Sequence, residues 1–128
     1  GIYSARWGKK NGGFKKAMLK IIQLVKNKNK NKKKQNTKAK FVCSLTLYLG
    51  HNKKITTKGE IYGTITEKIK GKNGFGYDSI FVPFGHNLTF GQMTKSKKML
   101  IDHRYIAFKK LKKKLKLFKS TSNSFIYL

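Results

Sequence analysis

The sequence has few acidic residues and few of the residues that build covalent or metal cross-links. Four of its 128 residues are carboxylates, and its single cysteine is Cys43. A lone cysteine excludes a disulfide framework and is typical of a reducing compartment, so we expect a cytoplasmic protein. The three histidines and four carboxylates are dispersed, so the sequence predicts neither a metal ligand set nor a nucleophilic triad, and no catalytic residue, within the chain.

Long apolar runs and arginine are also scarce. No stretch approaches the roughly 18 consecutive apolar residues of a membrane span, so no membrane association is expected. Of the 31 basic residues only Arg6 and Arg104 are arginine, the residue that makes bidentate contacts to bases. The net charge of +27 therefore has two explanations. We favour coding bias in an A/T-rich genome over selection for a polyanion partner such as nucleic acid.

Apolar residues recur at helical spacing near both ends of the chain, and they make up 38% of a sequence long enough for one domain core. The spacing predicts an amphipathic helix over 14–25 that begins near 11–13. A second stripe predicts a C-terminal helix that packs on a sheet; its members are Ile101, Tyr105, Phe108, Leu111, Leu115 and Phe118. Residues 26–40 are almost entirely Lys, Asn and Gln, which favours a flexible solvated connector over a nucleic-acid-binding arm.

The middle of the chain carries strand patterns. Residues 41–49 alternate, which predicts a strand with one well-buried face, and residues 55–65 are expected to return as its antiparallel partner. Gly50–Asn52 supply the turn, and Gly59 and Gly63 indicate bulges or close backbone approach.

A short third strand is predicted after a glycine-rich turn at 70–76. It covers 77–82 and is stopped by Pro83. The fold class is therefore mixed α/β, with a largely antiparallel sheet and flanking helices.

Two groups of aromatic and polar residues stand out. Phe75, Tyr77 and Asp78 follow the glycine turn, and Lys98, His103 and Arg104 are expected at the start of the last predicted helix. An aromatic ring offers a nucleobase a stacking surface. A six-keto purine presents an O6 acceptor and an N1–H donor, so an acceptor such as Asp78 and a donor such as Arg104 suit hypoxanthine or xanthine and leave adenine unpaired. The structural alternative is that Phe75 and Tyr77 are core aromatics and that His103 and Arg104 cap a helix.

An ordered series of motifs adds a family resemblance. The motifs are GIYSAR at 1–6, FVCSLTL at 41–47, GEIYGTI at 59–65, GFGYD and then IF within 74–81, TFGQM at 89–93, and Lys98 five residues before His103-Arg104. Together they resemble the inosine triphosphate pyrophosphatase family, also called dITP/XTP pyrophosphatases.

The resemblance implies a nucleoside triphosphate pyrophosphatase, usually a homodimer, which uses Mg²⁺ and water to convert ITP, dITP or XTP to the monophosphate and pyrophosphate. Such an enzyme cleanses the nucleotide pool of deaminated purines. The positions that match the family's substrate-binding residues are Phe75, Gly76, Tyr77, Asp78, Lys98, His103 and Arg104. Phe75 is the implied stacking ring, and Asp78 is an implied contact to the base edge.

The departures from the family pattern concern its N-terminal part. The family's Thr/Ser-Gly-Asn-x-x-Lys phosphate segment, metal-binding glutamate and DDSGL-like stretch do not occur in residues 1–128. We therefore expect the C-terminal portion of a single pyrophosphatase domain, with base recognition present and the magnesium ligands outside this chain. Ser79 stands where the family has proline, and Asp102 where it has serine.

Two rival interpretations remain at this point. The chain is a small basic nucleic-acid-binding module in one, and a degraded gene product without a stable fold in the other.

Overall fold

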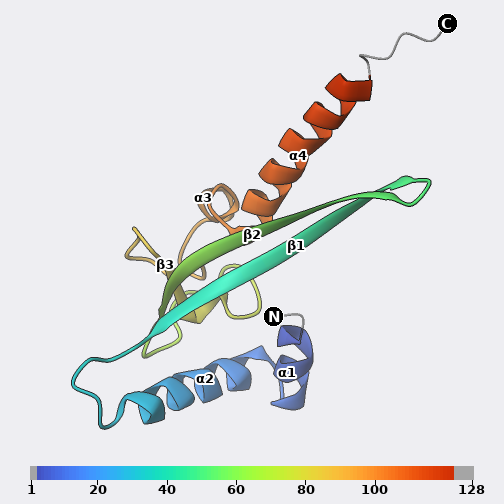
Figure 1. The fold of residues 1–128 in the computed structure, drawn as a ribbon. Coiled ribbons are helices and arrows are strands. Elements are labelled where there is room, and N and C mark those ends of the chain that lie inside the picture. Colours follow the sequence, from blue (N-terminus) through green and yellow to red (C-terminus); the bar gives the residue numbers. More distant parts are fainter. Residues whose placement is uncertain (1–2, 123–128) are drawn as a thin grey trace, which may run out of the picture. The chain divides into compact units, whose positions relative to one another are not determined.

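The computed structural model describes residues 3–122, with side chains as far as Leu117. Its elements are α1 (Ser4–Lys10), α2 (Phe14–Asn29), β1 (Lys38–Gly50), β2 (Lys53–Ile65), the 3₁₀ turn η1 (Asp78–Ile80), β3 (Phe81–Pro83), α3 (Lys95–Met99) and α4 (His103–Ser122) (Figure 1). The strands form one sheet in the order β1-β2-β3. The predicted mixed α/β fold with an antiparallel sheet is thus confirmed. None of the described helices is long and apolar enough to cross a membrane.

The chain divides into two compact units. The first contains Gly1–Phe41 and Ile61–Lys98, and the second contains Val42–Glu60 and Met99–Leu128. The long β1-β2 hairpin contributes residues to both units, because each of its strands passes from one unit to the other along its length (Figure 1). The prediction of a single domain stays a prediction.

The first unit has an apolar core between α2 and the segment around β3. Met18 and Ile22 of α2 are buried against Ile80, which is fully buried. Phe81 adds an aromatic part to this core, since its ring stacks on Phe41 with the ring centroids 4.2 Å apart. The helical spacing of the apolar residues in α2 therefore predicted the face that is buried.

The hairpin matches the predicted turn and the predicted alternation. His51 and Asn52 adopt positive φ angles of 46° and 60° at the turn, a conformation in which asparagine is enriched. Along β1 the predicted inner face is half-buried rather than well buried, because alternate residues are only intermediate in exposure. Gly63 confirms the predicted close approach, since a Cβ there would overlap the Val82 carbonyl oxygen of the paired strand β3.

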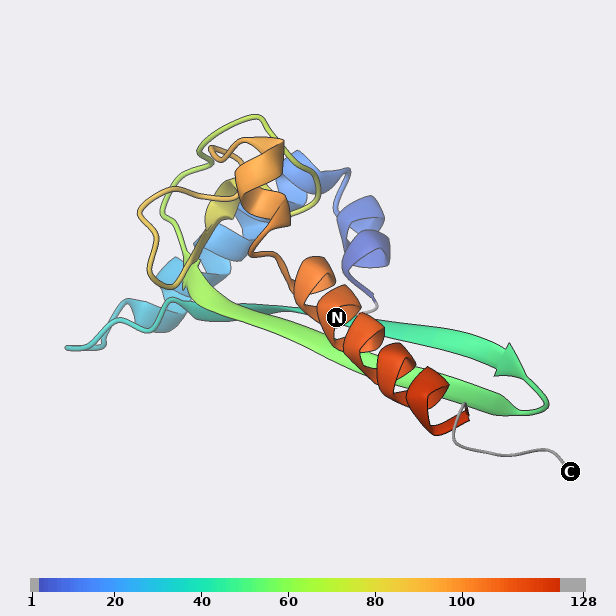
Figure 2. The same cartoon turned by 90° about the horizontal axis from the view of Figure 1, so that it is seen from above.

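The second unit is built by α4 lying along residues 53–60 of β2 (Figure 2). Gly59 permits this contact, because a Cβ there would overlap the His103 carbonyl oxygen and lie 2.5 Å from the Ala107 nitrogen. The hydroxyl of Thr57 donates to the Ala107 carbonyl oxygen at 2.8 Å. The predicted packing of the C-terminal helix on the sheet is confirmed.

Several sequence-based predictions need correction. Ala107, not Phe108, is a buried apolar residue of α4, and Phe108 is 50% exposed. The Phe118 side chain of the predicted stripe is not described, and Gly1 and Ile2 of GIYSAR lie outside the described residues. The sequence missed α1 and α3, which are short helices whose apolar residues are too few to set a periodicity. Residues 78–80 form a 3₁₀ turn, so the predicted third strand begins later, at Phe81.

The connector predicted over 26–40 is shorter in the structure. Helix α2 continues to Asn29 and β1 begins at Lys38, so the loop covers 30–37. A polar clamp formed by the buried Asn29 side chain accompanies the longer helix. The Asn29 side-chain amide donates to the carbonyl oxygens of Val25 and Asn36, and its oxygen accepts the Asn36 N–H at 2.9 Å.

Replacing Asn29 with alanine tests this clamp. The Asn29→Ala variant loses three hydrogen bonds at a residue that is 5% exposed, so we expect the free energy of unfolding to fall by about 1–3 kcal/mol. Urea unfolding measures the change, and Asn31→Ala in the exposed loop serves as the matched control, with an effect within about 0.5 kcal/mol. Equal effects of the two substitutions would show that the clamp contributes nothing.

Candidate functional site

The glycine turn of the first unit is closed by a carboxylate. The Asp78 side chain is 3% exposed, and its Oδ2 accepts the Phe75 backbone N–H at 2.8 Å. Gly74 has a φ angle of 74°, and a Cβ at Gly74 would overlap Asp78 Oδ2. This turn therefore needs glycine at position 74 both for its backbone conformation and for the room that the carboxylate occupies.

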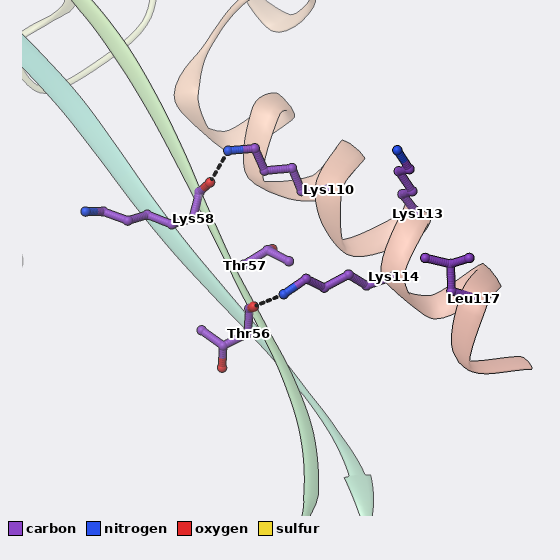
Figure 3. Close-up of a pocket in the computed structure, with 7 residues that line it drawn as sticks. All are labelled: Thr56, Thr57, Lys58, Lys110, Lys113, Lys114 and Leu117. Carbon is purple, nitrogen blue, oxygen red and sulfur yellow. Dashed lines mark hydrogen bonds between the residues drawn. The ribbon is translucent and has the colours of Figure 1, made fainter. Parts of the chain in front are cut away.

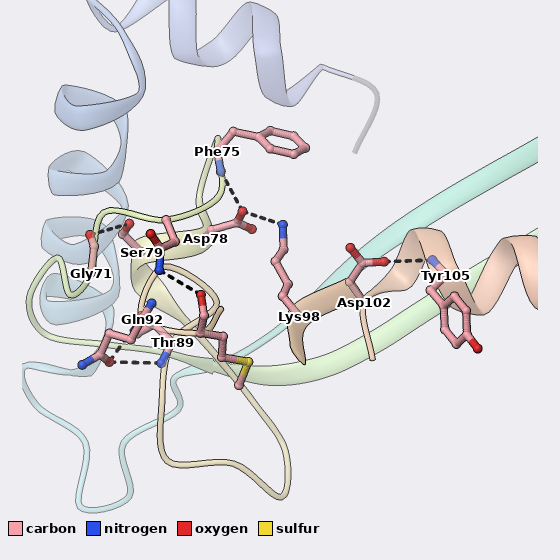
Figure 4. A network of polar contacts seen from close by, with 11 residues as sticks. Gly71, Phe75, Asp78, Ser79, Thr89, Gln92, Lys98, Asp102 and Tyr105 are labelled. Carbon is pink, nitrogen blue, oxygen red and sulfur yellow. Dashed lines mark hydrogen bonds and ion pairs between the residues drawn. The ribbon is translucent and has the colours of Figure 1, made fainter. Parts of the chain in front are cut away.

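A lysine from the following helix completes the arrangement. Lys98 of α3 is 7% exposed, and its Nζ donates to Asp78 Oδ2 at 2.7 Å in a buried ion pair (Figure 4). The same ammonium lies 4.9 Å from the centroid of the Phe75 ring and 5.5 Å from that of Phe90, within the range of cation–π attraction. The Phe75 ring itself is 61% exposed. The ion pair thus holds a loop that presents an aromatic ring to solvent.

Thr89 and Gln92 brace this loop from the other side (Figure 4). The Thr89 hydroxyl donates to the Lys70 carbonyl oxygen at 2.7 Å, and Thr89 and Gln92 exchange side-chain-to-backbone hydrogen bonds. Sequence analysis did not single out these two residues. Their spacing, a threonine three residues before a glutamine, is that of a capping box and could have indicated the role.

Ser79 makes a link that proline cannot make. Its hydroxyl donates to the Gly71 carbonyl oxygen at 3.0 Å, so position 79 is tied to the start of the glycine turn (Figure 4).

Gly76 and Tyr77 follow Phe75, and Tyr77 has structural partners. The Tyr77 hydroxyl donates to the Ser4 carbonyl oxygen at 2.8 Å, and its ring meets the Phe14 ring edge-on with centroids 5.4 Å apart. Desolvation by burial raises the pKa of the Tyr77 hydroxyl above its ordinary value. These contacts give Tyr77 a role in holding α1 and α2 against the glycine turn.

The remaining predicted residues belong to the second unit. His103 and Arg104 are the first residues of α4; His103 is 8% exposed, whereas Arg104 is exposed. Lys98 was expected at the start of this helix, but it lies in the separate helix α3 within the first unit. The structure therefore brings Phe75, Asp78 and Lys98 together, and the substrate-binding role of all the predicted residues, His103 and Arg104 included, stays a prediction.

Asp102 caps α4. Its Oδ1 accepts the Tyr105 backbone N–H at 2.8 Å, which satisfies one of the free donors of the first helical turn. Serine and aspartate are both favoured at this position, so the departure from the family's serine preserves the cap.

The carboxylates within the described part of the chain are not grouped as a metal site. No set of three or more His, Cys, Asp or Glu side chains converges there. Asp78 is paired with Lys98, and Glu60 is 2.7 Å from the ammonium of Lys58. The described part of this site therefore presents an exposed aromatic residue on a braced loop.

The fold is mixed α/β, and the braced loop presents the Phe75 ring as a candidate for stacking on a base. Comparison with known proteins gives the family of this chain. Residues 1–114 match the family model described as the Ham1 family. The chain therefore belongs to the Ham1 family, which confirms the resemblance seen in its motifs.

Related proteins agree with this assignment. The chain is 37% identical to a dITP/XTP pyrophosphatase of Clostridium tetani, with 91% of this chain and 55% of that protein covered. It is 42% identical to a dITP/XTP pyrophosphatase of Dictyoglomus thermophilum, with 88% and 53% covered. The chain thus spans about half the length of the curated relatives it matches.

Solved structures show the same fold. A HAM1 protein from Coxiella burnetii superposes with a TM-score of 0.77 at 27% identity, over 91% of this chain and 58% of that chain. The Ham1 protein of Staphylococcus aureus gives a TM-score of 0.70 at 34% identity, over 91% and 57%. The alternative of a small basic nucleic-acid-binding module finds no support among these relatives.

Removing one partner of the buried ion pair tests its importance. Lys98→Met leaves Asp78 buried without its cation, and Asp78→Asn leaves the Lys98 ammonium unpaired, so we expect each to lower the free energy of unfolding by about 3–5 kcal/mol. The double variant should lose less than the sum of the two, because it leaves no uncompensated buried charge. Urea unfolding of the unchanged chain, the two single variants and the double variant measures the coupling energy between Asp78 and Lys98.

Lys97→Met is the control, because Lys97 is an exposed lysine of the same helix, and it should change stability by less than about 0.5 kcal/mol. If the double variant lost as much unfolding free energy as the two single variants together, the expected coupling between Asp78 and Lys98 would be contradicted.

Proposed function

We propose that this chain forms the base-recognition part of a nucleoside triphosphate pyrophosphatase that hydrolyses ITP, dITP and XTP to the monophosphate and pyrophosphate. Membership of the Ham1 family and the names of the relatives support the activity. The observation that carries the assignment of base recognition is the exposed Phe75 ring on its braced loop.

Phe75 is the proposed stacking surface for the purine. Phe75 is 61% exposed, and its backbone N–H is held by Asp78. The loop conformation that presents the ring is therefore already fixed before a ligand binds. Stacking on an aromatic ring tolerates any base, since every base has a π-face. Discrimination between hypoxanthine and adenine therefore requires polar groups at the base edge.

Asp78 and Lys98 act on the base through Phe75 in this proposal. The resemblance implies a direct contact between Asp78 and the base edge, but Asp78 is 3% exposed and already accepts hydrogen bonds from Phe75 and Lys98. This geometry favours a positioning role.

Magnesium is the metal implied by the resemblance, and the described residues do not fit it. Mg²⁺ is held by carboxylate oxygens together with substrate phosphates. Of the four carboxylates, Asp78 and Glu60 are paired with lysines, and Asp102 caps a helix. The fourth, Glu67, belongs to no group of three possible metal ligands among the described residues. We therefore derive no hydrolytic step from these carboxylates, and we assign binding of the purine to Phe75, with Asp78 as a positioning residue.

The homodimer implied by the resemblance and the cytoplasmic location inferred from the single cysteine also stay predictions. Neither is needed for the proposed role of Phe75.

Removal of the stacking ring tests the recognition. Phe75→Ala should weaken binding of ITP by roughly 5- to 150-fold, because a stacked base contributes about 1–3 kcal/mol. Isothermal titration calorimetry measures the affinity, with ATP as the comparison ligand. Phe84→Ala is the matched control, since the Phe84 side chain is 55% exposed in the same unit, and it should leave the affinity unchanged. An equal effect of both substitutions would contradict the proposed site.

A second measurement concerns hydrolysis. We expect the 128-residue chain to release no pyrophosphate from ITP in the presence of Mg²⁺, because its described carboxylates are not grouped to hold the metal. A coupled pyrophosphate assay with ATP as control measures this. Release that is selective for ITP would show that these residues assemble their own metal site.

A further inference from the structure

A cationic groove lies between α4 and β2 within the second unit (Figure 3). Its volume is about 580 Å³, and its lining residues are Thr56, Thr57, Lys58, Lys110, Lys113, Lys114 and Leu117. Four of the seven are lysines. The groove is thus of the size of a small-ligand site, for which 300–1,000 Å³ is the usual range.

Two of the lysines are fixed in position by β2. Lys110 Nζ donates to the Lys58 carbonyl oxygen at 2.9 Å, and Lys114 Nζ donates to the Thr56 carbonyl oxygen at 3.3 Å (Figure 3). Residues four apart in a helix are separated by about 6.0 Å along its axis, and residues two apart in a strand by about 6.7 Å. The spacing of Lys110 and Lys114 along α4 is therefore close to that of the two carbonyl groups along β2. The two ammonium groups are therefore held at about this spacing.

These lysines keep most of their capacity to bind an anion. An ammonium group has three N–H donors, and each carbonyl contact uses one of them. Lys113 also lines the groove, but its ammonium points away from β2, and Glu60 offsets the charge of Lys58 at 2.7 Å (Figure 3). The groove therefore has two ammonium groups directed at β2, those of Lys110 and Lys114.

We propose that this groove binds a compact oligophosphate, with inorganic triphosphate as the probe. Several phosphate groups in one small ligand can bridge ammonium groups that are fixed about 6–7 Å apart. The described residues that line the groove include no aromatic ring for base stacking and no arginine for bidentate contacts. These features favour a compact anion over a nucleic acid strand.

The test uses the whole chain and two double variants that remove equal charge. Lys110→Gln with Lys114→Gln should weaken binding of inorganic triphosphate at least about tenfold, because two charge-assisted contacts are lost. Lys33→Gln with Lys34→Gln, in the exposed loop 30–37, should change the affinity less than about twofold, because remote exposed charges are screened. Lys110→Arg with Lys114→Arg keeps both charges and should retain binding, which separates loss of charge from loss of fold.

Calorimetry at about 0.15 M salt, with EDTA present, gives the affinities, and amide NMR shifts locate the ligand. We expect shifts at residues 56–58 and 110–117. Equal losses in the groove and loop variants would overturn the proposal, because affinity would then follow net charge alone. The proposal would also fail if a single-stranded oligonucleotide bound the groove more tightly than triphosphate, which would assign the surface to nucleic acid.

Discussion

The buried ion pair between Asp78 and Lys98 is the interaction on which the candidate site depends. Removing two charges from water is costly unless each satisfies the other, so the pair forms only if the glycine turn and α3 are both in place. Its formation fixes the Phe75 backbone and sets a cation beside the Phe75 ring. Thr89 and Gln92 then hold the segment between these elements, so that a small number of polar contacts define the loop.

The second unit depends on a different constraint, the close approach of helix and strand backbones. Gly59 removes the side chain that would keep α4 away from β2. Once the backbones are close, the Thr57 hydroxyl and the ammonium groups of Lys110 and Lys114 reach main-chain carbonyls across the contact. These two lysines are therefore structural contacts, while their remaining N–H donors give the groove its charge.

Residues that depart from the family pattern keep a physical role in this chain. Asp102 caps α4 as a serine would, because both side chains accept a backbone N–H of the first turn. Ser79 replaces the rigidity of proline by a hydrogen bond to Gly71. Family membership is thus compatible with local substitution at these positions.

The sequence by itself determined the hairpin, the buried face of α2, and the packing of a C-terminal helix, because burial on one face repeats with the period of the element. It also gave the family, through motifs in a fixed order. Only the tertiary structure decided that Asn29 and Asn36 shorten the connector, that Lys98 belongs to α3 and pairs with Asp78, and that Phe108 is exposed. The periodicity of apolar residues indicates which face of a helix or strand is buried. The contact between Asp78 and Lys98, which are 20 positions apart, depends instead on the path of the chain between them.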